Sequence, residues 1–169
     1  MAVLPVRQFG DPVLRTRASE VAEVDRAAKR LMKSMIQTME QAPGIGLAAT
    51  QVGVLKRIIV WEWEQEQGQL ANPAIVERGG EVEDEEGCLS LPGLLYPVVR
   101  SQWVVVEGLS AGGEYVRVEA EDMPARILQH EIDHLDGVLF IDHLSEELRR
   151  EALSRLRNME PAGEVAAGL

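Results

Sequence analysis

The chain has 169 residues, one cysteine and a net charge of -11, which comes from 28 acidic and 17 basic side chains. This length predicts one domain with a single core, spanning residues 1–169, and the acidic balance argues against direct binding to nucleic acid. A lone cysteine cannot form an internal disulfide, and no stretch predicts an export signal or a membrane span, so the composition favours the cytoplasm.

The first predicted element is a helix over residues 25–41 that begins at Asp25, a residue type suited to an N-cap. Its apolar side chains recur at helical spacing on one face: Ala28, Leu31, Met32, Met35, Ile36 and Met39. The methionine-rich stripe predicts core packing rather than a ligand surface. Pro43 and Gly44 end the helix.

The middle of the chain has the composition of β-strands, over residues 57–62, 102–107 and 114–119, with a weaker strand over 74–78. Three consecutive valines at 104–106 do not alternate with polar residues, which predicts a strand covered on both faces. Residues 81–86 carry five carboxylates, a pattern typical of a solvated loop or strand edge.

A second helix is expected after Asp122, with Asp122 as its N-cap and Pro124 tolerated in its first turn. This amphipathic segment carries His-Glu-Ile-Asp-His at residues 130–134, so two imidazoles lie one helical turn apart beside a carboxylate. The spacing is typical of a helix that holds a metal next to a general base.

Cys88 can supply a third ligand. A thiolate and two imidazoles leave the fourth position of a tetrahedral site open to water, as in catalytic sites and unlike structural ones. The sequence therefore predicts a metal-dependent hydrolase in which Cys88, His130 and His134 bind one divalent ion. Glu131 points to a different sector of the helix and is the expected general base.

Two other protein classes share part of this pattern. A zincin-type metallopeptidase would take its third ligand downstream of the helix, where His143 is the available histidine. A non-catalytic protein with a structural metal would need a fourth protein ligand and would not depend on Glu131. Metal binding that depends on Cys88 rather than His143 would exclude the metallopeptidase. Loss of function in Glu131→Gln would exclude the non-catalytic protein.

The last predicted helix runs from Ser145, as N-cap, to about Asn158, with Leu148, Ala152 and Leu156 on one face. Residues 160–169 are small and short of charge, which predicts a flexible tail. Strands gathered between helices predict an α+β fold. We expect antiparallel or mixed sheets packed around the central motif helix, followed by the C-terminal helix.

Three segments, in this order, resemble the peptide deformylase family: Gly44-Ile-Gly-Leu-Ala-Ala-Thr-Gln51, Glu86-Gly-Cys-Leu-Ser90 and Gln129-His-Glu-Ile-Asp-His134. The resemblance covers about residues 3–145. It implies a bacterial cytoplasmic enzyme that removes the N-formyl group from N-formyl-methionyl peptides of newly made proteins and releases formate.

The same resemblance implies site roles. The side-chain amide of Gln51 and the backbone N–H of Leu89 would stabilise the oxyanion. Four residues would contact the substrate: Ile45, Gly46, Glu86 and Leu128. The resemblance implies Fe²⁺ as the physiological metal, while the donor set also suits Zn²⁺, Ni²⁺ or Co²⁺ in purified protein.

Leu95 departs from the family pattern, because some members carry there a basic residue that receives the peptide backbone or carboxylate. Arg100 matches a more general family position, and we expect it to form a salt bridge with Asp133.

In some bacterial deformylases the terminal helix docks on the ribosome, and here that helix carries four arginines in an otherwise acidic chain. Its three glutamates leave it almost neutral, which favours an ordinary solvated face. Ribosome contact is therefore a hypothesis for this chain.

Overall fold

The computed structural model describes residues 2–159, so the tail predicted at 160–169 lies outside the described residues. The elements in chain order are η1 (Pro12–Arg15), α1 (Arg26–Gln41), β1 (Gly46–Ala48), η2 (Ala49–Val52), β2 (Ile58–Trp63), β3 (Glu66–Gly79), β4 (Val82–Cys88), β5 (Leu91–Arg100), β6 (Trp103–Leu109), β7 (Tyr115–Glu121), α2 (Met123–Leu135), η3 (Phe140–His143) and α3 (Glu146–Asn158).

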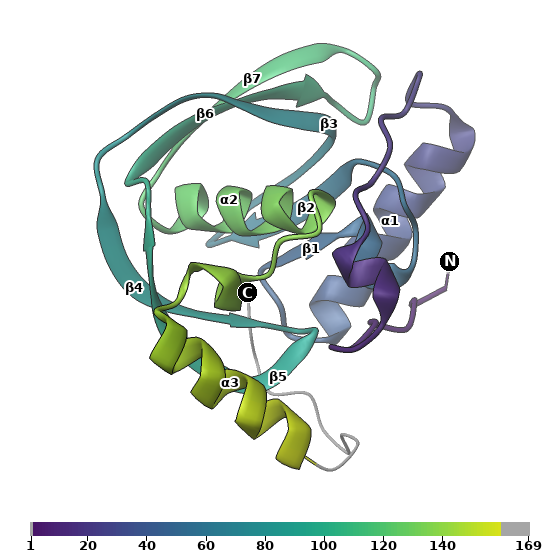
Figure 1. Ribbon diagram of the computed structural model, residues 1–169. Coiled ribbons are helices and arrows are strands. Elements are labelled where there is room, and N and C mark those ends of the chain that lie inside the picture. The colour runs from purple at the N-terminus through teal and green to yellow at the C-terminus, as the bar shows by residue number, and fades with distance from the viewer. Residues whose placement is uncertain (1, 160–169) are drawn as a thin grey trace.

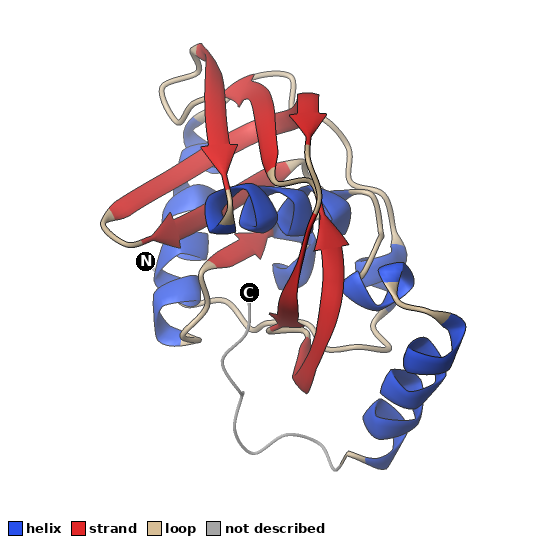
Figure 2. Ribbon diagram, turned by 90° about the vertical axis from the view of Figure 1, so that its left-hand side faces the viewer, coloured by secondary structure: helices blue, strands red, loops and turns tan. Residues whose placement is uncertain are grey.

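The helix α2 lies between the strands, as Figures 1 and 2 show from two directions. A five-stranded antiparallel sheet has the order β1-β2-β3-β6-β7, and β4 pairs with β5 in a separate two-stranded sheet. The predicted α+β fold around a motif helix is therefore confirmed. No helix among residues 2–159 is long and apolar enough to cross a membrane.

One expectation for α2, its amphipathic character, was wrong. Ten of its 13 residues are buried, so the helix is enclosed rather than amphipathic. Asp122 occupies the N-cap position, but its φ of 56° turns the chain into the helix and its side chain accepts no capping hydrogen bond. Its backbone carbonyl instead accepts the first helical bond, from the Arg126 N–H.

The helix α1 matches its prediction. The Asp25 side chain accepts a hydrogen bond from the Ala28 N–H at 2.8 Å and so caps the helix. Met32, Met35 and Met39 are fully buried in a cluster that includes side chains of β1 and β2. The methionine stripe is core packing, as expected.

The four predicted strands correspond to β2, β3, β6 and β7, and three of them begin one residue later than predicted. All three valines at 104–106 are buried. The strands β1, β4 and β5 were not predicted. The acidic run at 81–86 lies largely in β4, where Glu83, Asp84 and Glu85 are exposed and Glu86 turns inward. Because Glu86 points inward, the end of β4 contacts α2.

The helix α3 begins at Ser145, whose side chain accepts a hydrogen bond from the Leu148 N–H at 3.2 Å. Its apolar face packs into a cluster with Leu94 and Tyr96 of β5. The Tyr96 hydroxyl donates to Glu151 at 2.8 Å. This C-terminal helix is confirmed as predicted.

Candidate metal centre

Three donor atoms converge where the end of β4 meets α2. Cys88 Sγ lies 3.3 Å from His134 Nε2, and His134 Nε2 lies 3.2 Å from His130 Nε2. The donor atoms of all three residues lie within 4.8 Å of one another, and all three side chains are buried. A thiolate and two imidazoles at this separation are suited to holding one metal ion.

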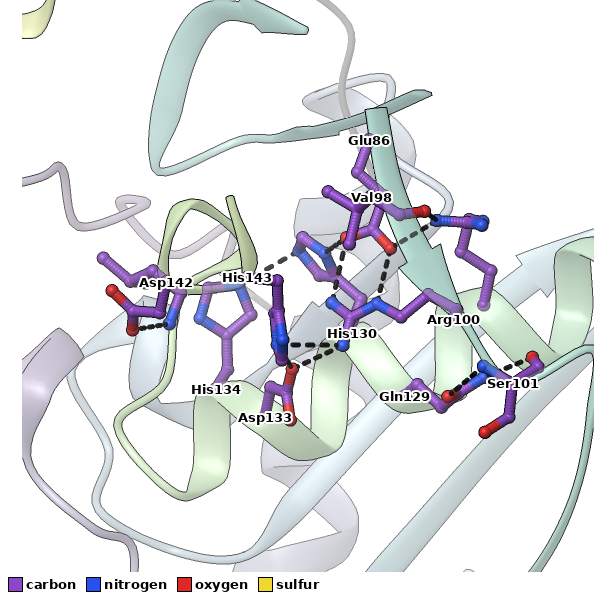
Figure 3. A network of polar contacts seen from close by, with 12 residues as sticks. Glu86, Val98, Arg100, Ser101, Gln129, His130, Asp133, His134, Asp142 and His143 are labelled. Atoms are coloured by element: carbon purple, nitrogen blue, oxygen red, sulfur yellow. Dashed lines mark hydrogen bonds and ion pairs between the residues drawn. The ribbon is translucent and has the colours of Figure 1, made fainter. Parts of the chain in front are cut away.

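His130 is held in one orientation by Glu86, whose Oε2 lies 2.9 Å from His130 Nδ1 (Figure 3). An ionised carboxylate only accepts hydrogen bonds, so Nδ1 carries the proton and donates it. The lone pair of Nε2 then faces Cys88 and His134. This is the supporting contact that histidine ligands of metals usually make.

Glu86 itself is fully buried, and arginines surround its carboxylate. Arg100 donates to both oxygens, at 2.7 and 3.0 Å, and Arg126 donates to Oε1 at 2.9 Å. Burial alone would raise the pKa of Glu86, but the contacts with His130 and Arg100 outweigh it and hold that pKa well below its ordinary value. The expected substrate contact is thus corrected, because the carboxylate supports His130 from behind.

The predicted salt bridge between Arg100 and Asp133 is confirmed at 2.6 Å. His143 Nε2 lies 2.8 Å from the same Asp133 oxygen and 3.2 Å from Arg100. Figure 3 shows His143 beside Asp133 and Arg100. His143 does not belong to the group of Cys88, His130 and His134. The geometry therefore argues against the metallopeptidase alternative, which needed His143 as a ligand.

Glu131 is fully buried, and within residues 2–159 neither of its carboxylate oxygens has a hydrogen-bond partner. Burial raises its pKa to about 7. A carboxylate with both oxygens free and a pKa near neutrality is suited to accept and return a proton. Gly46 of β1 lies against it, since a side chain at Gly46 would collide with the Glu131 carboxylate.

Gln51 lies on η2 with its amide oriented by two contacts. Its Oε1 accepts a hydrogen bond from the Ala48 N–H at 2.9 Å, and its Nε2 donates to Ser90 Oγ at 3.2 Å. The same Nε2 lies 3.6 Å from Cys88 Sγ. The N–H end of the amide therefore faces the three residues that could bind the metal. Leu89 follows Cys88 in the buried turn between β4 and β5.

The remaining residues expected to contact substrate lie in different environments. Ile45 is half-buried just before β1, and Gly46 is buried in that strand. Leu128 is fully buried and packs in the core cluster with Ile59 and Val106. Leu95 is 55% exposed on β5.

The sequence did not predict the contacts that two further residues, Arg126 and Ser90, make with this site. Arg126 is a charged residue inside an otherwise apolar turn of α2, four positions before His130. That break in the apolar pattern was the available signal. Ser90 was part of a recognised motif, but its contact with Gln51 depends on chain segments distant in sequence.

A family pattern and individual relatives with similar sequences point to the same protein family. The sequence pattern of the family described as polypeptide deformylase matches residues 3–150. Peptide deformylase of Acidothermus cellulolyticus is 48% identical over 165 residues, covering 98% of this chain and 92% of that protein. The peptide deformylase of Halothermothrix orenii is 52% identical over 144 residues, covering 84% and 94%.

Solved structures are similar as well. Peptide deformylase from Ehrlichia chaffeensis in complex with actinonin superposes with a TM-score of 0.90 at 37% identity, covering 96% of this chain and all of that one. The enzyme from Thermus thermophilus gives a TM-score of 0.87 at 44% identity, covering 92% and 93%.

Proposed function

The chain belongs to the polypeptide deformylase family, and from this premise we propose how its residues carry out the reaction. As a member of the family it is a metal-binding hydrolase that removes the N-formyl group from newly made peptides. We propose one catalytic domain over residues 1–169, because α2 contacts both sheets. Newly made formylated peptides arise in the bacterial cytoplasm, which we propose as the site of action.

The proposed ligands of the single metal ion are Cys88 Sγ, His130 Nε2 and His134 Nε2. Their convergence and the Glu86 contact that frees His130 Nε2 support this assignment. When bound, the ion supplies Lewis acidity toward the formyl carbonyl and the attacking water. We propose Fe²⁺ as the physiological ion on the strength of the family resemblance, with Zn²⁺, Ni²⁺ or Co²⁺ as substitutes that the same donors accept.

Glu131 is the proposed general base and then the general acid. One of its free carboxylate oxygens accepts a proton as water attacks the formyl carbon. The same oxygen returns that proton to the peptide nitrogen as the carbon–nitrogen bond breaks, which yields formate and a free amino terminus. Two buried oxygens that have no hydrogen-bond partner in the described part of the chain, and a pKa near neutrality, support both roles.

Attack on the formyl carbon places negative charge on its oxygen. We propose that Gln51 Nε2 and the Leu89 backbone N–H donate hydrogen bonds to this oxygen. The contact of Gln51 Oε1 with Ala48 supports the proposal, because it fixes which end of the amide faces Cys88. A donor oriented in advance needs no reorganisation during the reaction.

The peptide substrate would lie beside β1, which is the terminal strand of its sheet. An extended peptide can add to such an edge through backbone hydrogen bonds. Because Gly46 has no side chain, the Glu131 carboxylate lies directly against this edge. Ile45 would contact the methionine side chain, with Leu128 of the core beneath it.

The function is tested by formate release from a formyl-methionyl tripeptide, using protein prepared without oxygen and loaded with Fe²⁺. The control is Glu131→Ala, with metal content measured in both proteins. Release by the wild type and its loss in a metal-containing variant would support Glu131 as the base. Equal release by both would refute that role.

We also propose a transient ribosome contact through α3. Arg149 and Arg150 are exposed on this helix, and so is Arg157, whereas Arg155 contacts Tyr96 and Gly93. Exposed arginines can bind the phosphates of RNA. The observations that limit the proposal are two ion pairs, of Arg149 with Asp142 at 3.6 Å and of Arg150 with Glu146 at 3.0 Å.

Charge reversal of Arg149, Arg150 and Arg157 to Glu tests this contact better than truncation, because removing α3 would uncover its core cluster. The matched control reverses three exposed basic residues of α1, namely Arg26, Arg30 and Lys33. Selective loss of co-sedimentation with ribosomes in the α3 variant is expected. Equal binding by both variants would refute the contact.

A further inference from the structure

Arg126 is a charged residue that the reaction described above does not use. It lies on α2, is only 2% exposed and is among the largest fully buried side chains of the protein. Burying a guanidinium is costly unless its donors are paired. Its position inside the helix that carries His130 therefore needs a physical explanation.

The partners of Arg126 come from both strands of the two-stranded sheet. Its Nη1 donates to Glu86 Oε1 and to the carbonyl of Val98 on β5, each at 2.9 Å. Its Nη2 donates to the carbonyl of Val82 on β4, also at 2.9 Å. One side chain thus joins α2 to β4, to β5 and to the Glu86 carboxylate.

Arg126 and His130 are four residues apart on α2 and contact the two oxygens of the same carboxylate. Arg126 holds Oε1, and His130 Nδ1 lies at Oε2. Arg100 also contacts Glu86, but it extends from β5. Arg126 is therefore the cation that links the Glu86 carboxylate to α2, the helix that also carries His130.

We propose that Arg126 is a positioning residue for the deformylation site. It fixes Glu86 relative to α2, and Glu86 in turn fixes the ring of His130. This inference rests on the proposed role of His130 as a metal ligand. Contacts one layer behind a metal ligand commonly change metal affinity by roughly 10- to 100-fold when they are removed.

The test compares Arg126→Met with Arg57→Met. Arg57 is a matched control because it is also a buried arginine, 8% exposed, and it contacts the other end of α2 through the carbonyl of Leu135. It also pairs with Asp136, away from Glu86. Both substitutions keep an unbranched apolar stem and remove a buried cation.

The measurements are the affinity of metal-depleted protein for Co²⁺, the visible absorption spectrum of the Co²⁺ form, and kcat and KM. We expect Arg126→Met to weaken Co²⁺ binding by roughly 10-fold or more, to alter the spectrum and to lower kcat more than KM. Arg57→Met should lose stability with an unchanged spectrum. If the two variants show the same spectrum and affinity, Arg126 has only a structural role.

Glu86→Gln completes the test. If Arg126 acts through Glu86, its substitution should weaken Co²⁺ binding much less in the Glu86→Gln background, whereas additive effects would overturn the proposal. Should Arg126→Met fail to fold, Arg126→Lys keeps the charge but cannot reach all three partners, and we expect partial loss of affinity. A lysine variant with wild-type affinity and spectrum would also overturn it. Absence of Co²⁺ binding by the wild type would instead refute the proposed metal site.

Discussion

Gly46 and Glu131 are in direct contact, although they lie on different elements and 85 positions apart in the sequence. A Cβ atom at Gly46 would lie 2.9 Å from Glu131 Cδ and closer still to the carboxylate oxygen. Gly46 belongs to the edge strand proposed to receive the peptide, and Glu131 is the proposed base. The absence of a side chain at this position therefore keeps the base next to the substrate edge.

Gly46→Ala should displace Glu131 without removing a metal ligand. Misplacing a catalytic group by about 1 Å can cost on the order of 100-fold in rate, so we expect kcat to fall by about that factor while metal content stays unchanged. The measurement is formate release together with elemental analysis. Gly112→Ala is the control, because its nearest neighbour would be Ser110 Oγ at an ordinary 3.6 Å. Full activity of Gly46→Ala would contradict the crowding that the structure shows.

Gln51→Ala should lower kcat by roughly 100- to 1,000-fold, because removing one oxyanion donor typically costs that much. Ser90→Ala should cause a smaller loss, since it removes a contact of Gln51 Nε2 and leaves the Ala48 contact in place. Steady-state kinetics with the formyl-methionyl tripeptide measure both effects. An exposed amide provides the control in Gln67→Ala. A Gln51→Ala effect confined to KM would assign that amide to binding rather than to the transition state.

The parts of the fold that the sequence could predict are those that local patterns determine. Asp25 and Ser145 cap their helices as expected, because an N-cap depends on residues within one turn. The motif at 130–134 places both imidazoles on one side of a helix for the same reason. Cys88 could be assigned to the same site only because a thiolate is a suitable third metal ligand, since the sequence does not show its distance from the two histidines.

The parts that could not be predicted depend on contacts between distant segments. Glu86 ends a run of carboxylates that is typical of a solvated loop or strand edge, and its place in the segment around Cys88 set it apart from the other four. That place did not reveal that Glu86 is the only one of the five that is buried. What distinguishes it is the pair of arginines that reach it, from β5 and α2. The α2 helix was expected to be amphipathic, but most of its residues are buried. Arg126 pairs with Glu86 and Asp133 pairs with Arg100, whereas Glu131 is buried with no hydrogen-bond partner among residues 2–159.

The raised pKa of Glu131 predicts a pH-dependent difference between the wild type and Glu131→Gln in metal-depleted protein. Burial raises the pKa from 4.5 to about 7, so the folded state holds a proton that the unfolded state releases. The stability of the wild type is then fully present below 4.5 and is lost as the pH rises through 7. Glu131→Gln cannot ionise and should gain about 3 kcal/mol relative to the wild type across this range.

Urea unfolding of both metal-depleted proteins between about pH 5 and about pH 8 measures this difference. Because the two chains share every other titrating group, the comparison isolates Glu131. Parallel stability curves for the two proteins would show that Glu131 has an ordinary pKa when folded.

The final prediction concerns how much stability the protein loses in Arg100→Ala. The sequence indicated only the Asp133 salt bridge, whereas the structure adds two hydrogen bonds to the fully buried Glu86. Removing one partner of a buried pair typically costs about 3–5 kcal/mol, so Arg100→Ala should lower the free energy of unfolding by that amount. Asp133→Asn should cost only about 1 kcal/mol, because the Asp133 side chain is 25% exposed and Arg100 keeps its contacts with Glu86.

Urea unfolding of the metal-depleted variants measures both losses, and Arg150→Ala serves as a surface control. Arg150 and Glu146 are 77% and 89% exposed, so breaking their pair should change stability by less than about 0.5 kcal/mol. A loss in Arg100→Ala no larger than that in Asp133→Asn would mean that the contact with Glu86 contributes nothing. A clearly larger loss is expected, since Glu86 would lose the arginine that contacts both of its oxygens.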